Sequence, residues 1–248
     1  MKIGILGVGH IGKTLARALS AAGHEVKVAN SRGPETVDPE ALVHGATAVS
    51  TPDAVRDVDV VILSVPFHRL RDVIPVVAEV PLDTVVIDTS NYYPFRDNEV
   101  EAIEGGQVES VWVAEQLGRP IAKAWNAIGA ASFAANGKPA GSPGRLAIPV
   151  AASDDKHREV ALQLVEDTGF TAFDAGSLED SWRQQPGTPC YCTDLTESEI
   201  QVALPTADRA RSPKRRDLSV AVFAERYDDS MANPDEETMR RVNRALFM

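Results

Sequence analysis

A glycine-rich turn near the N-terminus constrains the fold of this chain more than any other feature. An apolar run, Ile3–Leu6, leads into glycines with the spacing Gly-x-Gly-x-x-Gly, and an alanine-rich segment with helical spacing follows. In this pattern the first glycine permits a tight turn, the second lets the backbone approach a pyrophosphate, and the third lets the helix pack on the strand. The predicted phosphate-binding turn consists of Gly7, Val8, Gly9, His10, Ile11 and Gly12. The alternative is a glycine turn in an α/β protein that binds no nucleotide.

The end of the second predicted strand, Glu25–Ala29, indicates which dinucleotide the turn binds. Sites for NAD usually carry Asp or Glu at this point, where the carboxylate holds the ribose 2′-hydroxyl. This chain carries Asn30, Ser31 and Arg32 instead. Neutral donors and a guanidinium suit a 2′-phosphate, so the sequence predicts NADP(H) as the cofactor. The alternative for Ser31 and Arg32 is an ordinary solvated loop.

Composition limits the classes of partner. The 248 residues include 25 Lys and Arg against 36 Asp and Glu, which gives a net charge of −11. An acidic chain has no general attraction for nucleic acid or for an anionic membrane. No apolar run is long enough to span a bilayer, and no signal peptide precedes the first strand. Two cysteines, Cys190 and Cys192, are too few for a disulfide framework, so a cytoplasmic protein is expected.

Strands and helices alternate along most of the chain. Beyond the first two strands, the predicted strands are Val58–Pro66, Thr84–Ser90, Ile121–Trp125, Arg145–Ala151 and Phe170–Phe173. A helix is expected to about Asp167, capped by Asp154 or Asp155. This alternation predicts an α/β fold with a doubly wound, mainly parallel Rossmann sheet over residues 1–176. Residues 177–248 are expected to form a short C-terminal cap rather than an independent domain, with helices near 197–204, 217–225 and 236–246.

Several segments together carry a family resemblance. They are the glycine turn, Ser31-Arg32, Val65-Pro66-Phe67-His68, Asn126–Phe133 and Asp174-Ala-Gly176. In this order they resemble the NADP-dependent oxidoreductases related to coenzyme F-420 (deazaflavin) reductases, a Rossmann type that also occurs in certain metalloreductases. The resemblance covers roughly the first three-quarters of the chain and leaves out everything from Trp182 onward. It implies that Val65, Pro66 and His68 lie near the nicotinamide, and that the turn at 126–130 borders the second substrate.

The reaction can be considered separately from the cofactor. Hydride transfer to a flavin-like ring needs stacking and orientation more than a protein acid. A carbonyl or imine acceptor needs a proton donor as well. Lys123, Asn126 and His68 are the candidate catalytic residues, with His10 and Tyr191 as further possible donors. Lys123 is expected near the carboxyl end of its strand, but it could instead pair with a carboxylate.

The acceptor pocket is expected where open parallel sheets bind ligands, at the carboxyl ends of the strands. The converging ends are 7–11, 64–68, 90–91 and 126–129, which adds Ser64 to the expected cofactor contacts. The polar and aromatic segment 182–194 is expected to roof this pocket. The expected substrate contacts are Asn126, Ile128, Gly129, Trp182, Arg183 and Tyr191. Cys190 and Cys192 are read as free thiols, and no metal site is expected.

Three functions remain open. The first is an NADPH-dependent oxidoreductase that reduces a flavin-like or small organic acceptor. The second is an imine- or hydroxyacid-type reductase with Lys123 as proton donor, although such enzymes usually add a long helical C-terminal domain. The third is a non-catalytic NADPH-sensing protein. A homodimer is expected in each case, because the short aromatic and helical tail suits burial against a second copy.

Overall fold

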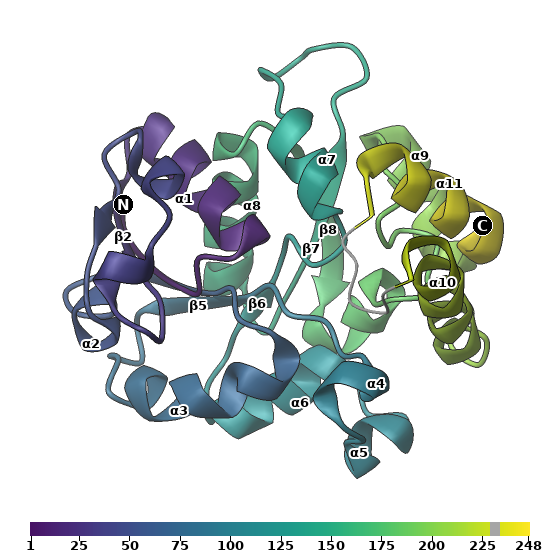
Figure 1. The fold of residues 1–248 in the computed structure, drawn as a ribbon, viewed down its shortest axis with the longest axis horizontal. Coiled ribbons are helices and arrows are strands. Elements are labelled where there is room, and N and C mark those ends of the chain that lie inside the picture. Colours follow the sequence, from purple (N-terminus) through teal and green to yellow (C-terminus); the bar gives the residue numbers. More distant parts are fainter. Residues whose placement is uncertain (229–233) are drawn as a thin grey trace.

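A single eight-stranded sheet forms the centre of the computed structural model, which describes residues 1–228 and 234–248 (Figure 1). The strands are β1 (Lys2–Leu6), β2 (Glu25–Ala29), β3 (Thr47–Ala48), β4 (Val60–Leu63), β5 (Val85–Asp88), β6 (Ala122–Lys123), β7 (Ala147–Ala152) and β8 (Thr171–Ser177). Their order is β3-β2-β1-β4-β5-β6-β7-β8, and every neighbouring pair is parallel except β6 and β7. The predicted α/β Rossmann fold is confirmed. The order reverses between β1 and β4, which is where such sheets bind ligands.

Helices cover both faces of the sheet. The longer ones in the core are α1 (His10–Ala21), α3 (Leu70–Ala78), α6 (Glu109–Leu117) and α8 (Asp155–Asp167). Shorter ones are α2 (Thr51–Ala54), α4 (Pro94–Asp97), α5 (Glu101–Glu104) and α7 (Ala130–Ala135), together with the 3-10 turns η1 (Pro34–Thr36), η2 (Pro39–Leu42) and η3 (Phe67–Arg69). α1 and α8 lie on one face, and α3 and α6 lie on the other (Figure 1).

The strand sequences explain this layering. Successive side chains of a strand point to opposite faces, so a strand covered on both sides must be apolar throughout. In β4, Val60 and Ile62 pack with α1 and α8, whereas Val61 and Leu63 pack with α3 and α6. All four are buried. The near-continuous apolar run in this part of the sequence is therefore the signature of a doubly covered strand.

The expected element ends are close to those observed, with a few differences. Asp154 caps α8 as predicted, because its side chain accepts a hydrogen bond from the His157 N–H at 2.9 Å. The strand expected over 121–125 is only two residues long, and β8 extends four residues beyond the predicted Phe173. α10 begins at Ser212, earlier than expected, because Pro213 suits the first turn of a helix. The two-residue β3 and the short helices α4, α5 and α7 have too little periodicity to be predicted.

The C-terminal part packs beside β7 and β8. Its elements are η4 (Leu178–Gln184), α9 (Glu197–Ala203), η5 (Leu204–Thr206), α10 (Ser212–Tyr227) and α11 (Glu236–Phe247). These helices gather at the end of the sheet opposite the N-terminus (Figure 1). The Ala147 N–H donates to the Leu195 carbonyl at 2.8 Å, and Arg244 Nε of α11 donates to the Thr193 carbonyl at 2.7 Å. The segment before α9 is thus bound to the sheet on one side and to the last helix on the other.

Candidate functional site

The three glycines of the N-terminal turn have different structural roles. Gly7 has φ of +96°, and a Cβ there would lie 2.3 Å from the Ser64 carbonyl oxygen. A Cβ on Gly12 would lie 2.0 Å from the Gly7 carbonyl oxygen, whereas a Cβ on Gly9 would meet no atom of the described residues within 4 Å. Gly7 and Gly12 are therefore required by the fold itself. Gly9 instead leaves open space above the turn, as a cradle for a phosphate group requires.

The N-terminus of α1 offers unpaired donors beside that space. Gly9 is the N-cap and supplies no side-chain cap, and the first turn holds no acidic residue. The first hydrogen bond of the helix runs from the Lys13 N–H to the Gly9 carbonyl at 2.8 Å. Within the described residues, the N–H groups of His10, Ile11 and Gly12 therefore have no protein acceptor. Unpaired N–H groups and the helix dipole together favour an anion such as a pyrophosphate.

A first hollow of about 560 Å³ lies over the carboxyl ends of β1, β2 and β4. The predicted cofactor residues that line it are Gly7, Val8, Gly9, Asn30, Ser31, Ser64, Val65, Pro66 and His68. Arg32 is exposed and does not line this hollow. It directly follows Ser31, which does line the hollow.

Two residues of this hollow, Asn30 and His68, do not have the roles that the sequence predicted. Asn30 accepts a hydrogen bond from the Val8 N–H at 3.0 Å and donates to the Thr36 carbonyl at 3.2 Å. Its amide therefore fixes the glycine turn and is not a free donor for a 2′-phosphate. His68 was expected near the nicotinamide, yet it lines the first hollow only, with Nδ1 2.8 Å from Asp97 Oδ1. The carboxylate of Asp97, at the end of α4, holds the imidazole there.

A second hollow of about 360 Å³ continues from the first. Gly9, Ser64, Val65 and Pro66 line both. The predicted residues His10, Ile11, Asn126, Ile128, Gly129 and Tyr191 also line the second hollow, together with the strand-end residues Ser90 and Asn91. The two hollows thus form one continuous depression across the point where the strand order reverses. This is the shape that an extended dinucleotide and a neighbouring second molecule require.

A pair of tyrosines forms one wall of the second hollow. The hydroxyl oxygens of Tyr93 and Tyr191 are 2.8 Å apart, and the Arg96 guanidinium lies 5.2 Å from the Tyr93 ring centre. Burial raises the pKa of both hydroxyls above the ordinary value for tyrosine, so both are protonated at neutral pH. One hydroxyl donates to the other within the pair, which leaves the second proton available to a bound molecule. Met239 of α11 completes this side of the hollow.

Tyr93, Arg96 and Met239 were missed by sequence reasoning. A signal existed for Tyr93, because it comes two residues after Asn91, at a strand end that was expected to face the pocket. No local pattern marks Met239, since it reaches the hollow from the last helix of the chain.

Asn126 is buried and fully hydrogen-bonded. Its Nδ2 donates to the Gln184 carbonyl at 2.9 Å and to Asn91 Oδ1 at 3.1 Å, and its Oδ1 accepts from Gln184 Nε2 at 2.9 Å. The expectation that this amide is presented to an acceptor carbonyl is therefore corrected. Asn126 clamps the end of β5 to the cap and so fixes the floor of the second hollow.

Lys123 lies beneath the second hollow rather than in it. Its side chain is fully buried, with Nζ 2.5 Å from Asp88 Oδ2 and hydrogen-bonded to the Ser90 carbonyl. It lines neither hollow. The role of proton donor expected for Lys123 does not fit this position. The alternative reading, an ion pair with a carboxylate, is the one that the structure shows.

The segment 182–194 reaches the second hollow only through Tyr191 and Cys192. Trp182 lies between two arginines, with the guanidinium carbons of Arg183 and Arg209 at 4.6 Å and 5.7 Å from its ring centre. Arg183 is also paired with Asp180. Trp182 lines a separate cavity, so the expectation that Trp182 and Arg183 roof the acceptor pocket is corrected. Their mutual stacking and the Asp180 pair hold both side chains away from the sheet ends.

Two further observations concern metals and membranes. Among residues 1–228 and 234–248, no three His, Cys, Asp or Glu side chains are grouped closely enough to hold a metal ion. Cys190 and Cys192 are free, and burial raises the pKa of the Cys190 thiol to about 12. No helix within the same residues combines the length and apolarity needed to cross a membrane.

Comparisons with known proteins find similarity in the N-terminal part of the chain, which contains the glycine turn. Residues 2–92 match the model of the family described as NADP oxidoreductase coenzyme F420-dependent, a segment that runs from β1 past the end of β5. The chain is also 41% identical over 88 residues to the putative protein YjhV of Escherichia coli (strain K12). That match covers 36% of this chain and 64% of YjhV, which is less than two thirds of the curated relative.

Solved structures resemble a larger part of the chain. The hypothetical protein SMa0349 from Sinorhizobium meliloti superposes with a TM-score of 0.68 and 29% identity, over 79% of this chain and 95% of that one. A putative F420-dependent NADP-reductase from Arthrobacter sp. FB24 superposes with a TM-score of 0.57 and 21% identity, over 72% and 86% of the two chains. At 21% identity the second likeness shows a shared fold.

Proposed function

We propose that the protein is an NADPH-dependent oxidoreductase, because residues 2–92 match the model of the family described as NADP oxidoreductase coenzyme F420-dependent. It transfers a hydride between NADPH and a flavin-like or small organic acceptor. The observation that carries this proposal is the continuity of the two hollows across Gly9, Ser64, Val65 and Pro66. One hollow contains the phosphate-binding turn, and the other has room beside it for a second molecule.

The residues present fit the cofactor. The open space above Gly9 and the unpaired N–H groups of the first turn of α1 would hold the pyrophosphate. Ser31, which lines the first hollow, and Arg32, which follows it, would contact the 2′-phosphate, with Arg32 able to form a charge-assisted fork. NADPH supplies a hydride when bound.

The tyrosine pair accounts for the proton that reduction of a carbonyl, an imine or a ring nitrogen requires. Tyr191 and Tyr93 are protonated, share one hydrogen bond, and line the second hollow. The hydroxyl whose proton is not shared donates it to the acceptor, and the other replaces it through the 2.8 Å contact. In this proposal Tyr191 and Tyr93 take the part first expected of Lys123.

The direct test measures binding and turnover separately. The purified protein is titrated with NADPH by calorimetry, and NADPH oxidation is followed by absorbance with oxidised deazaflavin, riboflavin and small aldehydes as acceptors. Binding together with turnover of at least one acceptor supports the proposal. Tight NADPH binding with no oxidation by any acceptor would favour the NADPH-sensing alternative, and no binding would reject both.

Replacing Arg32 by alanine tests the cofactor preference. The Kd for NADPH is expected to rise at least tenfold, about 1.4 kcal/mol, while the Kd for NADH changes little, because only NADPH carries the 2′-phosphate. Calorimetric titration of both cofactors provides the measurement. Arg226→Ala is the matched control, since Arg226 is exposed on α10 and lines neither hollow. Equal affinities for NADPH and NADH in the unmodified protein would contradict the assignment.

Replacing Tyr191 by phenylalanine tests the proton transfer. We expect kcat for an acceptor that needs a proton to fall by a factor of about 10². The Kd for NADPH is expected to stay within about a factor of three, well under 1.4 kcal/mol. Tyr93→Phe should give a similar loss, and the double variant should lose little more, because the two hydroxyls act as one unit. Tyr227→Phe is the control, since that hydroxyl bonds Asp235, away from the hollow. Unchanged kcat in both single variants would exclude the pair as donor.

The other expectations about partners and location also stay proposals. A homodimer fits the exposed Leu218 and Val222, which lie one turn apart on α10 and are 45% and 40% exposed. A cytoplasmic location and the absence of nucleic-acid or membrane partners are proposed on the composition alone.

A further inference from the structure

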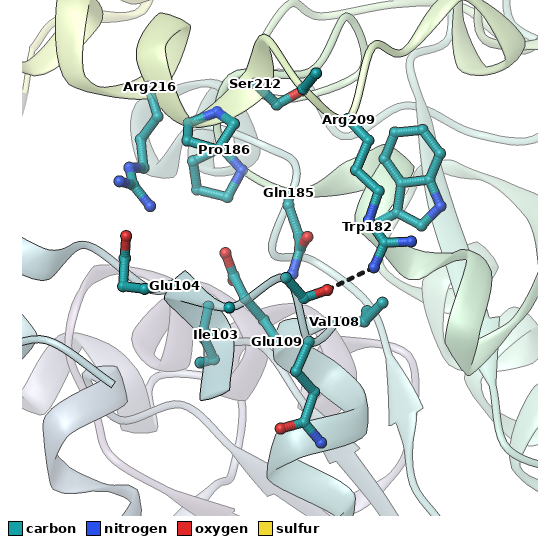
Figure 2. Close-up of a pocket in the computed structure, with 15 residues that line it drawn as sticks. Ile103, Glu104, Val108, Glu109, Trp182, Gln185, Pro186, Arg209, Ser212 and Arg216 are labelled. Carbon is teal, nitrogen blue, oxygen red and sulfur yellow. Dashed lines mark hydrogen bonds between the residues drawn. The ribbon is translucent and has the colours of Figure 1, made fainter. Parts of the chain in front are cut away.

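A cavity of about 300 Å³ lies between the core and the C-terminal part, and none of its lining residues belongs to the two hollows. Residues 103–109, around the connection from α5 to α6, form one side of it. Trp182, Gln185, Pro186 and part of the segment 209–216 form the other (Figure 2). We call it the cap cavity. Its volume lies at the lower end of the range of small-molecule sites, about 300–1,000 Å³.

Arg216 brings unpaired donors to the cap cavity. The residue is 6% exposed, and its Nε donates to Asp217 Oδ1 at 2.8 Å. Within the described chain, its two terminal nitrogens have no hydrogen-bond acceptor; the guanidinium lies 5.7 Å from the Tyr92 ring centre. Figure 2 shows this group at one end of the cavity, facing Glu104. Asp217 therefore engages only one edge of this buried guanidinium, and the terminal nitrogens remain available to an acceptor in the cavity.

Glu109 brings an unpaired acceptor. It is 4% exposed, and its Oε2 accepts a hydrogen bond from the Tyr92 N–H at 3.1 Å, while its other oxygen has no donor among the described residues. Burial raises the pKa of this carboxyl to about 7, against the opposing effects of Lys123, the Tyr92 N–H and Arg216. Glu104 lines the same cavity and is exposed toward its outer side. Both carboxyl groups point into the space in Figure 2.

Gln185 and Trp182 complete the lining. The Gln185 Nε2 is buried and has no acceptor among the described residues, and its amide extends into the cavity. The Trp182 indole provides a flat apolar wall. Arg209 donates to the Gly106 carbonyl at 2.7 Å, which joins the two sides of the cavity. The free donors of the cavity are therefore on Arg216 and Gln185, and the free acceptors are on Glu104 and Glu109.

We propose that the cap cavity is a second binding site, for a small zwitterion that carries a carboxylate and an ammonium group, as an amino acid does. The carboxylate would accept from the Arg216 guanidinium and the Gln185 amide, in the forked arrangement that arginine favours. The ammonium would donate to Glu104 and Glu109, and an aliphatic side chain would pack on Trp182. A simple anion would leave both carboxyl groups without a donor, and a simple cation would leave the terminal nitrogens of Arg216 without an acceptor, so neither matches the lining.

The test is calorimetric titration of the full chain with glycine, L-alanine, L-glutamine and L-leucine, each compared with its amide and its N-acetyl form. The amide lacks the carboxylate, and the N-acetyl form lacks the ammonium. We expect at least one of the four zwitterions to bind with one site per chain, and both blocked forms to bind at least tenfold more weakly. Failure of all four zwitterions to bind, or equal binding of a blocked form, would mean a water-filled space and would overturn the proposal.

Variants locate the binding. Arg216→Gln is expected to weaken binding of the zwitterion at least tenfold, whereas Arg215→Gln should not, since Arg215 donates to the Phe247 carbonyl and does not line the cavity. Glu104→Gln removes an exposed charge, so it keeps the proposal testable if Arg216→Gln does not fold; it should weaken binding about fivefold. Unchanged affinity in a folded Arg216→Gln protein, or in Glu104→Gln, would overturn the proposal. The same samples are also titrated with NADPH, which tests the proposed cofactor site independently of the cap cavity.

Discussion

Lys123→Met is expected to destabilise the protein by about 3–5 kcal/mol, because it leaves a fully buried carboxylate without its cation. Asp88 would keep its hydrogen bond from the Ser90 N–H at 3.0 Å, but this neutral donor does not replace a charge 2.5 Å away. Denaturant titration of the variant and the unmodified protein measures the loss. It also decides between the two readings of Lys123, since a proton donor would affect kcat more than stability.

The matched control is the double variant Asp88→Asn/Lys123→Met. The asparagine oxygen still accepts from the Ser90 N–H, and no charge remains buried, so we expect the double variant to recover at least half of the lost stability. A single variant that keeps full stability but loses turnover would contradict the structural role of Lys123. A double variant less stable than the single one would show that packing, rather than the unpaired charge, causes the loss.

The second large expected effect distinguishes the glycine proposed to bind the cofactor from the glycines that the fold requires. Gly9→Ala is expected to leave the thermal unfolding midpoint nearly unchanged, because a Cβ there meets no atom of residues 1–228 and 234–248 within 4 Å and φ is −77°. The same methyl group would occupy the space proposed for the pyrophosphate, so the Kd for NADPH should rise at least tenfold, about 1.4 kcal/mol. Differential scanning calorimetry and NADPH titration on the same sample give both readouts.

Gly12→Ala serves as the structural counterpart. Its Cβ would lie 2.0 Å from the Gly7 carbonyl oxygen, so α1 must shift away from β1 and we expect a loss of stability of about 1–3 kcal/mol. A Gly9→Ala protein that binds NADPH normally would remove the turn from the proposed cofactor site. A Gly9→Ala protein that melts like Gly12→Ala would show that Gly9, too, is required by the fold.

The first strand, the turn and α1 could be predicted from sequence because the patterns that mark them are local. The glycine spacing, the apolar run and the helical spacing occur within 22 residues, and their pairing with β2 and β4 follows from the parallel order. The doubly apolar pattern of β4 likewise predicted its burial on both faces. Local patterns of this kind were sufficient for the fold class and for the position of the turn.

The roles of single polar side chains could not be predicted in the same way. Lys123 pairs with Asp88, which lies 35 positions earlier in the chain, and Asn126 bonds Gln184, which lies 58 positions later. Their sequence neighbours give no sign of these partners. Trp182 and Tyr191 belong to one polar, aromatic segment, yet they line different cavities. Composition identified the segment, but only the path of the backbone decides where each ring lies.

The clamp at the floor of the second hollow consists entirely of carboxamides. Asn91, Asn126 and Gln184 are joined by direct hydrogen bonds between their side chains. None of these groups gains or loses a proton between acidic and alkaline conditions, so a change of pH within that span does not alter the hydrogen bonds of the clamp by titrating its members. A pH dependence of the reaction rate would therefore come from other groups, such as those that exchange protons with the bound molecules, and not from titration of the clamp.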